Sequence, residues 1–210
     1  MPGRLLAIFP LEVALLPHAR LPLHIFEDRY KEMIGECIDQ KCEFGVVLRR
    51  DQGILRTGCS ASIERVIERY DDGRLDILTV GRRRFEIEDI DTERSFMRAE
   101  VRYLEDADFA EPSKEVVERA LEIYRVLSAG EAEPEPQPGA PELSFRLAAI
   151  SDDHDFRQQL LAMPGEAERM KKVAEHLAWL AYRQGTTETM KKVVRSNGHG
   201  RHITKIGEGL

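Results

Sequence analysis

The sequence predicts an α+β protein in which a β-rich lobe over residues 1–110 is followed by a helical lobe over residues 111–185. In the first lobe, apolar residues form short runs or alternate with polar residues up to Tyr103, a pattern typical of strands. In the second lobe they recur at spacings of three and four residues, which indicates amphipathic helices. Residues 129–141 hold four prolines and two glycines, and we interpret them as a loop.

Several short segments of the first lobe have the pattern of strands. The predicted strands cover residues 4–10, 12–17, 21–25, 43–50, 59–70, 76–90 and 97–103. Between Ile63 and Val66 the apolar alternation slips by one residue, which predicts a β-bulge. The pair Asp72-Gly73 favours a type I′ hairpin turn, and Gly81 indicates a bulge or bend in the strand that follows.

One helix is expected to interrupt the strands, from Glu27 to about Asp39, because apolar residues recur there at helical spacing. We expect Phe26 to begin the apolar side of this helix. Its replacement by alanine would then cost about 3–5 kcal/mol if the ring were fully buried. His24 lies just before the helix, and we expect its ring to hydrogen-bond backbone groups that the first helical turn leaves unpaired.

Four helices are predicted in the second lobe, at residues 114–128, 142–150, 155–163 and 166–184. Ser113 is placed to cap the first of them, and Gly185 is placed to end the last. We expect the remaining residues, 186–210, to form a basic and flexible tail.

The composition of the chain argues against nucleic-acid-binding, membrane and disulfide-rich classes of protein. With a formal net charge of -7 and a pI of about 5.5, the chain has no general attraction for nucleic-acid phosphates. We find no uncharged run long enough to cross a bilayer and no signal peptide, so no membrane partner is expected. Three cysteines are too few for a disulfide scaffold and favour a reducing compartment, the cytoplasm. Cys37 and Cys59 occupy apolar positions and are expected to be buried.

Sequence motifs for common chemistry are missing. The sequence contains no G-x-x-x-x-G-K-[ST] phosphate loop, no G-x-S-x-G elbow, no H-E-x-x-H and no C-x-x-C. We therefore expect no catalytic residue, no metal site and no cofactor. The three arginines at 82–84 alternate between the faces of a strand, and we expect them to meet the acids Glu86, Glu88 and Asp89 in solvent.

Four segments together resemble one family. They are "FPLEVALLPHARLPLHIFEDRYKEMI", "FGVVL", "GCSASIERVIERYDDGRLDILTVGRRRFEI" and "RQQLLAMPGEAERMKKVAEHL", in this order. They are similar to the N-terminal, substrate-binding domain of Lon proteases in its stand-alone form, from about Leu5 to about Tyr182. The resemblance implies a PUA-like antiparallel β-barrel lobe with one inserted helix, then an α-helical lobe, and a distant relationship to the N-terminal domain of cereblon. It implies no active site, because the ATPase and the Ser–Lys peptidase of Lon lie in other domains.

The resemblance also implies a function. It is that of a non-catalytic module that binds unfolded or exposed polypeptide segments, as an adaptor or chaperone-like factor for an ATP-dependent protease or a chaperone. Candidate contacts lie in the loop before the first helix and on the solvent face of that helix: Leu16, His18, Arg20, Asp28, Arg29 and Glu32. An RNA-binding PUA-like protein is the alternative, supported by the arginines at 82–84 and the basic tail but opposed by the overall acidity. An enzyme whose site is assembled from distant residues is the third hypothesis.

Overall fold

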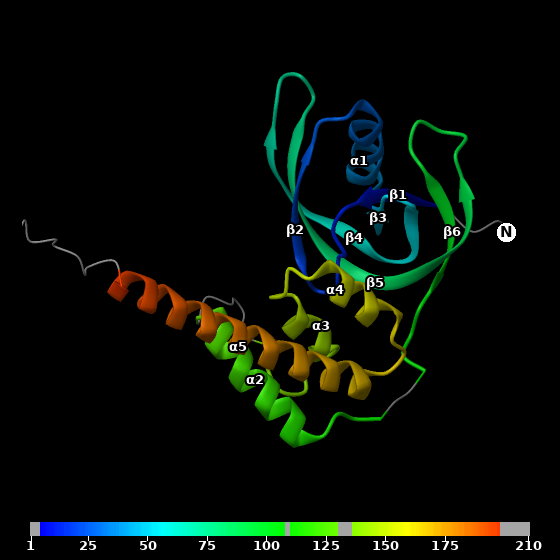
Figure 1. Cartoon of the computed structure of the whole chain (residues 1–210). Coiled ribbons are helices and arrows are strands. Elements are labelled where there is room, and N and C mark those ends of the chain that lie inside the picture. The colour runs from blue at the N-terminus through cyan, green and yellow to red at the C-terminus, as the bar shows by residue number, and fades with distance from the viewer. Residues whose placement is uncertain (1–4, 108–109, 130–135, 198–210) are drawn as a thin grey trace, which may run out of the picture.

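The computed structural model of the chain describes residues 5–107, 110–129 and 136–197, with side chains up to Gly185. A curled sheet with one helix against it forms the upper lobe in Figure 1, and helices form the lower lobe. The strands are β1 (Leu6–Leu11), β2 (Arg20–Ile25), β3 (Phe44–Arg50), β4 (Gly53–Arg69), β5 (Leu75–Asp91) and β6 (Arg98–Tyr103). The helices are α1 (Asp28–Gln40), α2 (Lys114–Ser128), α3 (Leu143–Ala148), α4 (His154–Ala162) and α5 (Glu166–Asn197). The predicted order, β-rich with one inserted helix and then helical, is confirmed.

The sheet is mixed rather than antiparallel. Its strand order is β2-β5-β4-β3-β1-β6, and β5 also pairs with β6, so the sheet curls back on itself. The prediction of an antiparallel barrel is wrong at one pair, because β1 and β3 run parallel, with Phe9 opposite Val46. Parallel neighbours need a crossover connection, and β2 and α1 supply it. Since β1 and β6 pair only at Leu6 and Ala7, the closure of the barrel is slight.

The long hairpin of β4 and β5 confirms two predictions and corrects a third. The register shifts between Ile63 and Arg65, where the sequence predicts a bulge. The hairpin turn lies where it was predicted, but it is not of type I′. That type needs positive φ at both central residues, whereas Gly73, with φ of 83°, is the only residue of this turn with positive φ. The Gly73 amide donates to the Tyr70 carbonyl at 2.9 Å and closes the turn.

Gly81 is the point at which the chain before β2 packs directly on β5. The amide of His18 donates to the carbonyl of Gly81, and the amide of Gly81 donates to the carbonyl of Ala19, both at 2.9 Å. A Cβ atom on Gly81 would lie 2.1 Å from the carbonyl oxygen of Leu16, so only glycine fits here. The register against β4 also shifts between Gly81 and Arg84, which is the bulge that the sequence predicts.

The first helix begins one residue later than predicted and leaves Phe26 outside it. Glu27 is the N-cap residue, and Tyr30, Met33 and Cys37 are among the side chains that α1 buries. Phe26 is 59% exposed and stacks on the ring of His24, with centroids 5.9 Å apart. The prediction that it starts the apolar side of the helix is therefore wrong, because it precedes the cap and does not share the helical periodicity.

The two lobes share one apolar core. The larger cluster of buried apolar side chains runs from Phe9 and Met33 in the sheet lobe to Phe145 and Met170 in the helical lobe. A smaller cluster, made by Leu6, Ile8, Val47, Phe85, Ile87 and Ala99, fills the curled part of the sheet. Residues 12–17, which were predicted as a strand, are irregular, and their apolar side chains enter the larger cluster instead.

The helical lobe follows the sequence prediction except at its end. Ser113 caps α2, its hydroxyl accepting a hydrogen bond from the amide of Val116 at 3.4 Å. The prediction that Gly185 ends the last helix is wrong, since α5 continues to Asn197 and projects from the body (Figure 1). A glycine inside a helix costs only about 1 kcal/mol, and no proline follows it. The rest of the predicted tail, residues 198–210, lies outside the described residues.

Candidate functional site

A buried ionic cluster joins the two lobes. Arg169 on α5 is fully buried, and its guanidinium donates to both carboxylate oxygens of Asp106, at 2.7 and 2.6 Å, and to Glu166 at 2.8 Å. Arg84 on β5 donates to the same Asp106 at 2.5 Å and to the carbonyls of Leu161 and Met163. The prediction that this arginine meets strand acids in solvent is wrong, because the helical lobe covers this face of the sheet.

The pKa values of the two buried arginines shift in opposite directions. Burial, followed by the nearby charge of Arg169, lowers the pKa of Arg84. Burial also acts against the charge of Arg169, but the hydrogen bonds that it donates to Asp106 and Glu166 outweigh burial and raise the pKa of that group. Since both guanidinium groups converge on the carboxylate of Asp106, the cluster acts as a structural clamp between the lobes.

Two of the predicted contact residues serve the junction between the lobes. Leu16 is fully buried and offers no surface to a ligand. His18 has a left-handed backbone, with φ of 66°. Its ring lies between two residues of the helical lobe, with Nε2 2.8 Å from Glu142 and Nδ1 accepting from Arg146 at 3.0 Å. The sequence indicates the loop that contains Leu16 and His18, but it does not indicate that the helical lobe packs on this loop.

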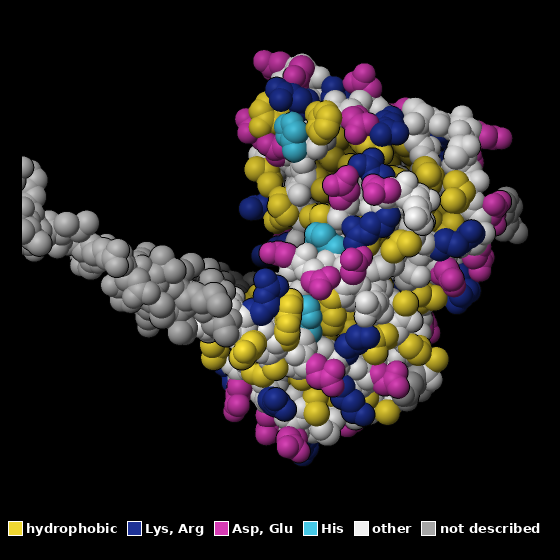
Figure 2. Space-filling view, in the orientation of Figure 1, with side chains coloured by type: hydrophobic (Ala, Val, Ile, Leu, Met, Phe, Trp, Pro, Cys, Tyr) yellow, Lys and Arg dark blue, Asp and Glu magenta, His cyan; other side chains and the backbone are white. Residues whose placement is uncertain are grey.

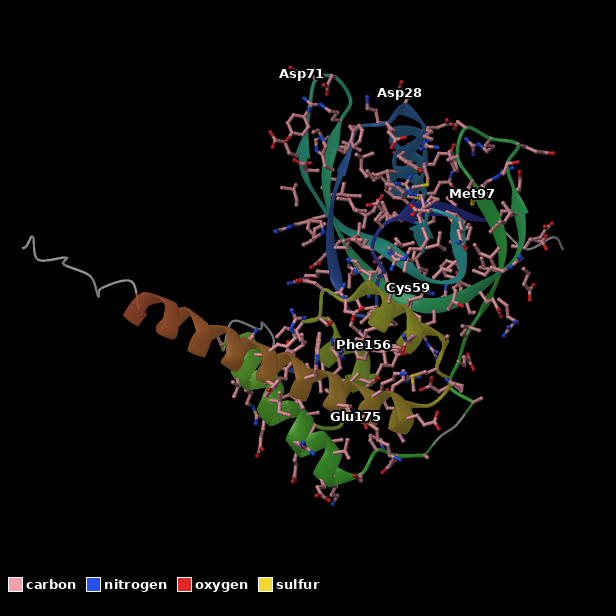
Figure 3. All side chains as sticks on the ribbon, in the orientation of Figure 1. Asp28, Cys59, Asp71, Met97, Phe156 and Glu175 are labelled. Atoms are coloured by element: carbon pink, nitrogen blue, oxygen red, sulfur yellow. The ribbon has the colours of Figure 1, made fainter. Side chains whose placement is uncertain are left out.

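The other predicted residues are at the surface, and each has a charged neighbour. The ion pairs join Arg20 to Glu64, Asp28 to Lys31, Arg29 to Glu27, and Glu32 to Arg94. The Asp28 side chain is 99% exposed at the tip of α1, as Figure 3 shows. Hydrogen bonds from Ser95 and Arg94 lower the pKa of Glu32, which is therefore engaged with the segment before β6. Asp28 and Arg29 are the two predicted contacts that lie nearest to Phe26 in the chain.

An apolar groove lies beside these residues, between the edges of β1 and β2. Its volume is about 380 Å³, and it is lined by Phe9, Pro10, Leu11, Glu12, Leu23, His24, Ile25, Phe26, Glu27, Tyr30 and Arg49. Phe26 is the most exposed apolar side chain that lines it, and Tyr30 from α1 packs on Phe9, with ring centroids 4.1 Å apart. Figure 2 shows hydrophobic side chains between charged ones over this lobe. We call this feature the β1–β2 groove.

The backbone of both strands is open toward the groove. In the described part of the chain, β2 pairs only with β5, and β1 beyond Ile8, whose amide donates to the Met97 carbonyl at 2.8 Å, pairs only with β3. Unpaired strand edges present N–H and C=O groups to any extended chain nearby. Pro10 and Pro22 each remove one N–H donor from these edges, which leaves the carbonyls as the more numerous groups.

His24 is held by the neighbouring strand, not by the helix start. It faces Asp76 across the β2–β5 pair, with Nδ1 2.5 Å from the carboxylate. The hydroxyl of Tyr70 donates to the same carboxylate at 2.7 Å. Hydrogen bonds from His24 and Tyr70 lower the pKa of Asp76, and those to Asp76 and Glu68 raise the pKa of Tyr70 to about 12. This polar cluster fixes the ring on which Phe26 stacks.

Other kinds of site find little support in the described parts of the chain. There, no three His, Cys, Asp or Glu side chains are grouped so as to hold a metal ion. None of the helices in those residues is long and apolar enough to span a membrane. The arginines at 82–84 point in different directions: Arg82 bonds Ser62, Arg83 pairs with Glu43, and Arg84 is buried. The prediction that they meet Glu86 and Glu88 is wrong, because these two acids pair with Arg102 on the neighbouring strand β6.

Solved structures place this architecture in a known class, that of Lon N-terminal domains. The crystal structure of a Lon N-terminal domain protein from Xanthomonas campestris superposes with a TM-score of 0.67 and 27% identity, over 83% of this chain and 98% of that chain. The N-terminal domain of the Mycobacterium avium complex Lon protease has the same fold, with a TM-score of 0.61 and 16% identity over 83% of this chain and 98% of that chain.

The sequence comparison identifies the family. Residues 6–178 match the ATP-dependent protease La (LON) substrate-binding domain, and the chain belongs to this family. Lon protease of Parabacteroides distasonis is 28% identical over 113 residues, which is 50% of this chain. The chain spans 14% of the length of that relative.

Proposed function

We propose that this chain is a non-catalytic module that binds unfolded or exposed polypeptide segments in the β1–β2 groove. The observation that carries the proposal is the exposure of Phe26, 59% of whose surface faces solvent at the wall of an apolar groove. Membership of a substrate-binding family supports it. Exposed aromatic side chains in a concave apolar surface are the usual anchors of protein recognition.

The groove fits an extended segment with spaced apolar residues. The open edges of β1 and β2 can accept or donate backbone hydrogen bonds, and this is the way in which sheet edges bind peptides. Glu12 and Glu27 lie at the rim together with Arg49, so both signs of charge are available to flanking residues. Of the contacts predicted from the sequence, Asp28 and Arg29 follow the groove residues Phe26 and Glu27 in the chain without lining the groove, and Arg20 lies at the start of β2.

The biological role that we infer is that of an adaptor or chaperone-like factor. In this role the module would act in the cytoplasm and hold a client for an ATP-dependent protease or a chaperone. The family match supports this, because in a Lon protease the same domain is joined to the rest of the enzyme.

Binding of a polypeptide that cannot refold tests the proposal. We would titrate the full chain into a fluorescently labelled, reduced and carboxymethylated protein and measure anisotropy. Replacing Phe26 with alanine removes an apolar contact worth about 1.5–3 kcal/mol when fully buried, so binding should weaken at least tenfold. The matched control is Ile67→Ala, because Ile67 is 54% exposed but lies outside the groove.

Stability must be measured on the same variants. Since Phe26 is largely exposed, Phe26→Ala should change the free energy of unfolding by less than about 1 kcal/mol. The proposal fails if the wild-type chain does not bind the unfolded protein. It fails as well if Ile67→Ala weakens binding as much as Phe26→Ala does.

RNA binding is the second candidate, and the divergence of the arginines at 82–84 weakens it. Electrophoretic shifts with RNA at low and high salt discriminate between the two functions, because phosphate contacts weaken as salt rises. A shift at low salt that is lost in Arg82→Ala/Arg83→Ala would favour RNA.

A further inference from the structure

The end of α1 carries two cysteines in a single structural motif. Lys41, with φ of 50°, ends the helix in the left-handed region, and its amide donates to the carbonyl of Ile38 at 3.3 Å. The amide of Cys42 donates to the carbonyl of Cys37 at 3.1 Å. This pair of hydrogen bonds defines a Schellman motif, and Cys37 and Cys42 occupy the two positions whose side chains ordinarily meet across it.

The motif brings the two thiols within reach of each other. In this motif the chain folds back on the last turn of the helix, so the two residues lie beside each other, and a disulfide needs α-carbons roughly 4.4–6.8 Å apart. Cys37 is 3% exposed within the larger apolar core, and Cys42 packs against the same cluster. Both side chains also line one hollow of about 810 Å³ between the end of α1 and the strands β1 and β6.

The two cysteines differ in access. Cys42 is half-buried, so a small oxidant in the hollow can reach it, whereas Cys37 is almost fully buried. Cys59, which Figure 3 labels where the sheet meets the helical lobe, is the internal reference. It is fully buried, its thiol donates to the Ser60 carbonyl at 3.3 Å, and burial raises its pKa. A buried thiol of this kind reacts slowly.

We propose that Cys37 and Cys42 form a reversible disulfide when the protein meets a peroxide. The thiolate of Cys42 attacks one peroxide oxygen, the O–O bond breaks, and a sulfenic acid and water are formed. The thiol of Cys37 then attacks the Cys42 sulfur, the S–S bond forms, the S–O bond breaks, and the second water leaves. In sum, two thiols lose two electrons and two protons, and one peroxide is reduced to two waters.

The disulfide would tie α1 to the sheet. Cys42 lies two residues before β3, so the bond joins the last turn of α1 to the start of a central strand. It also fixes one wall of the hollow. A reducing compartment would return the pair to thiols, so the modification would be formed only during oxidation.

Peptide mapping of the intact chain tests this inference. The full-length protein is treated with hydrogen peroxide, its remaining thiols are blocked with N-ethylmaleimide after unfolding, and trypsin is added. Trypsin cuts after Lys41, so the two cysteines fall in separate peptides, residues 32–41 and 42–49. Cys59 falls in a third, residues 57–65.

The expected product is residues 32–41 linked to residues 42–49, with an intact mass about 2 Da lower than that of the reduced chain. The peptide of residues 57–65 should carry maleimide, and dithiothreitol should abolish the link. In Cys42→Ser, Cys37 should remain a thiol under the same treatment. Oxidation of Cys42 to a sulfinic acid, or its linkage to a second chain, with residues 32–41 still reduced, would overturn the inference.

Discussion

Replacing Asp106 with alanine would remove the carboxylate on which the two buried arginines converge. Asp106 accepts two hydrogen bonds from Arg169 and one from Arg84, at 2.5–2.7 Å. Arg169 keeps Glu166 at 2.8 Å, but Arg84 keeps only the carbonyls of residues 161 and 163. Removing one partner of a buried ion pair typically costs about 3–5 kcal/mol, and we expect a loss of that size.

Urea unfolding followed by circular dichroism measures this loss. The matched control is Asp28→Ala, since Asp28 is an exposed aspartate at the tip of α1 and its loss should change stability by about 0.5 kcal/mol or less. Asp106→Asn should fall between the two, because it keeps one acceptor but no charge. A loss below about 1 kcal/mol for Asp106→Ala would refute the view that this cluster holds the lobes together.

Two further outcomes follow from the same structure. Gly81→Ala places a Cβ atom 2.1 Å from the Leu16 carbonyl, so we expect a loss of several kcal/mol, and a melting temperature equal to wild type would contradict the close approach. Because the pKa of Asp76 is lowered by His24 and Tyr70, its contribution is complete above the unfolded value of about 3.9 and is lost as the pH falls through the lower folded value. Asp76→Asn should therefore flatten the pH dependence of stability below about pH 4, and urea titrations that show an unchanged profile would argue against this.

Local features of the fold could be predicted from the sequence because neighbouring residues decide them. The apolar spacing of α1, the bulge near Glu64 and the cap at Ser113 all rest on residues that are close in the sequence. Their signals are therefore present in any short window of the sequence.

The candidate site was less predictable, because exposure depends on what packs from elsewhere. Leu16 was predicted at the surface and is buried, whereas Phe26 was predicted in the core and is exposed. In the sequence, an apolar residue that will be buried cannot be distinguished from one that will be exposed. The groove itself is formed by two strands whose edges remain open. The alternation of apolar residues in a strand does not show which strands lie next to it in the sheet.

The sequence by itself determined the family, the order of strands and helices, and the turns and caps that join them. Only the tertiary structure decided that β1 and β3 run parallel, that Arg84 is enclosed by the helical lobe and that Phe26 faces an open groove. Periodicity specifies which face of an element is apolar. The partner that covers that face comes from residues as far as 143 positions away, as between Ala14 and Arg157. Such pairings are set by the packing of the whole chain and not by any local pattern.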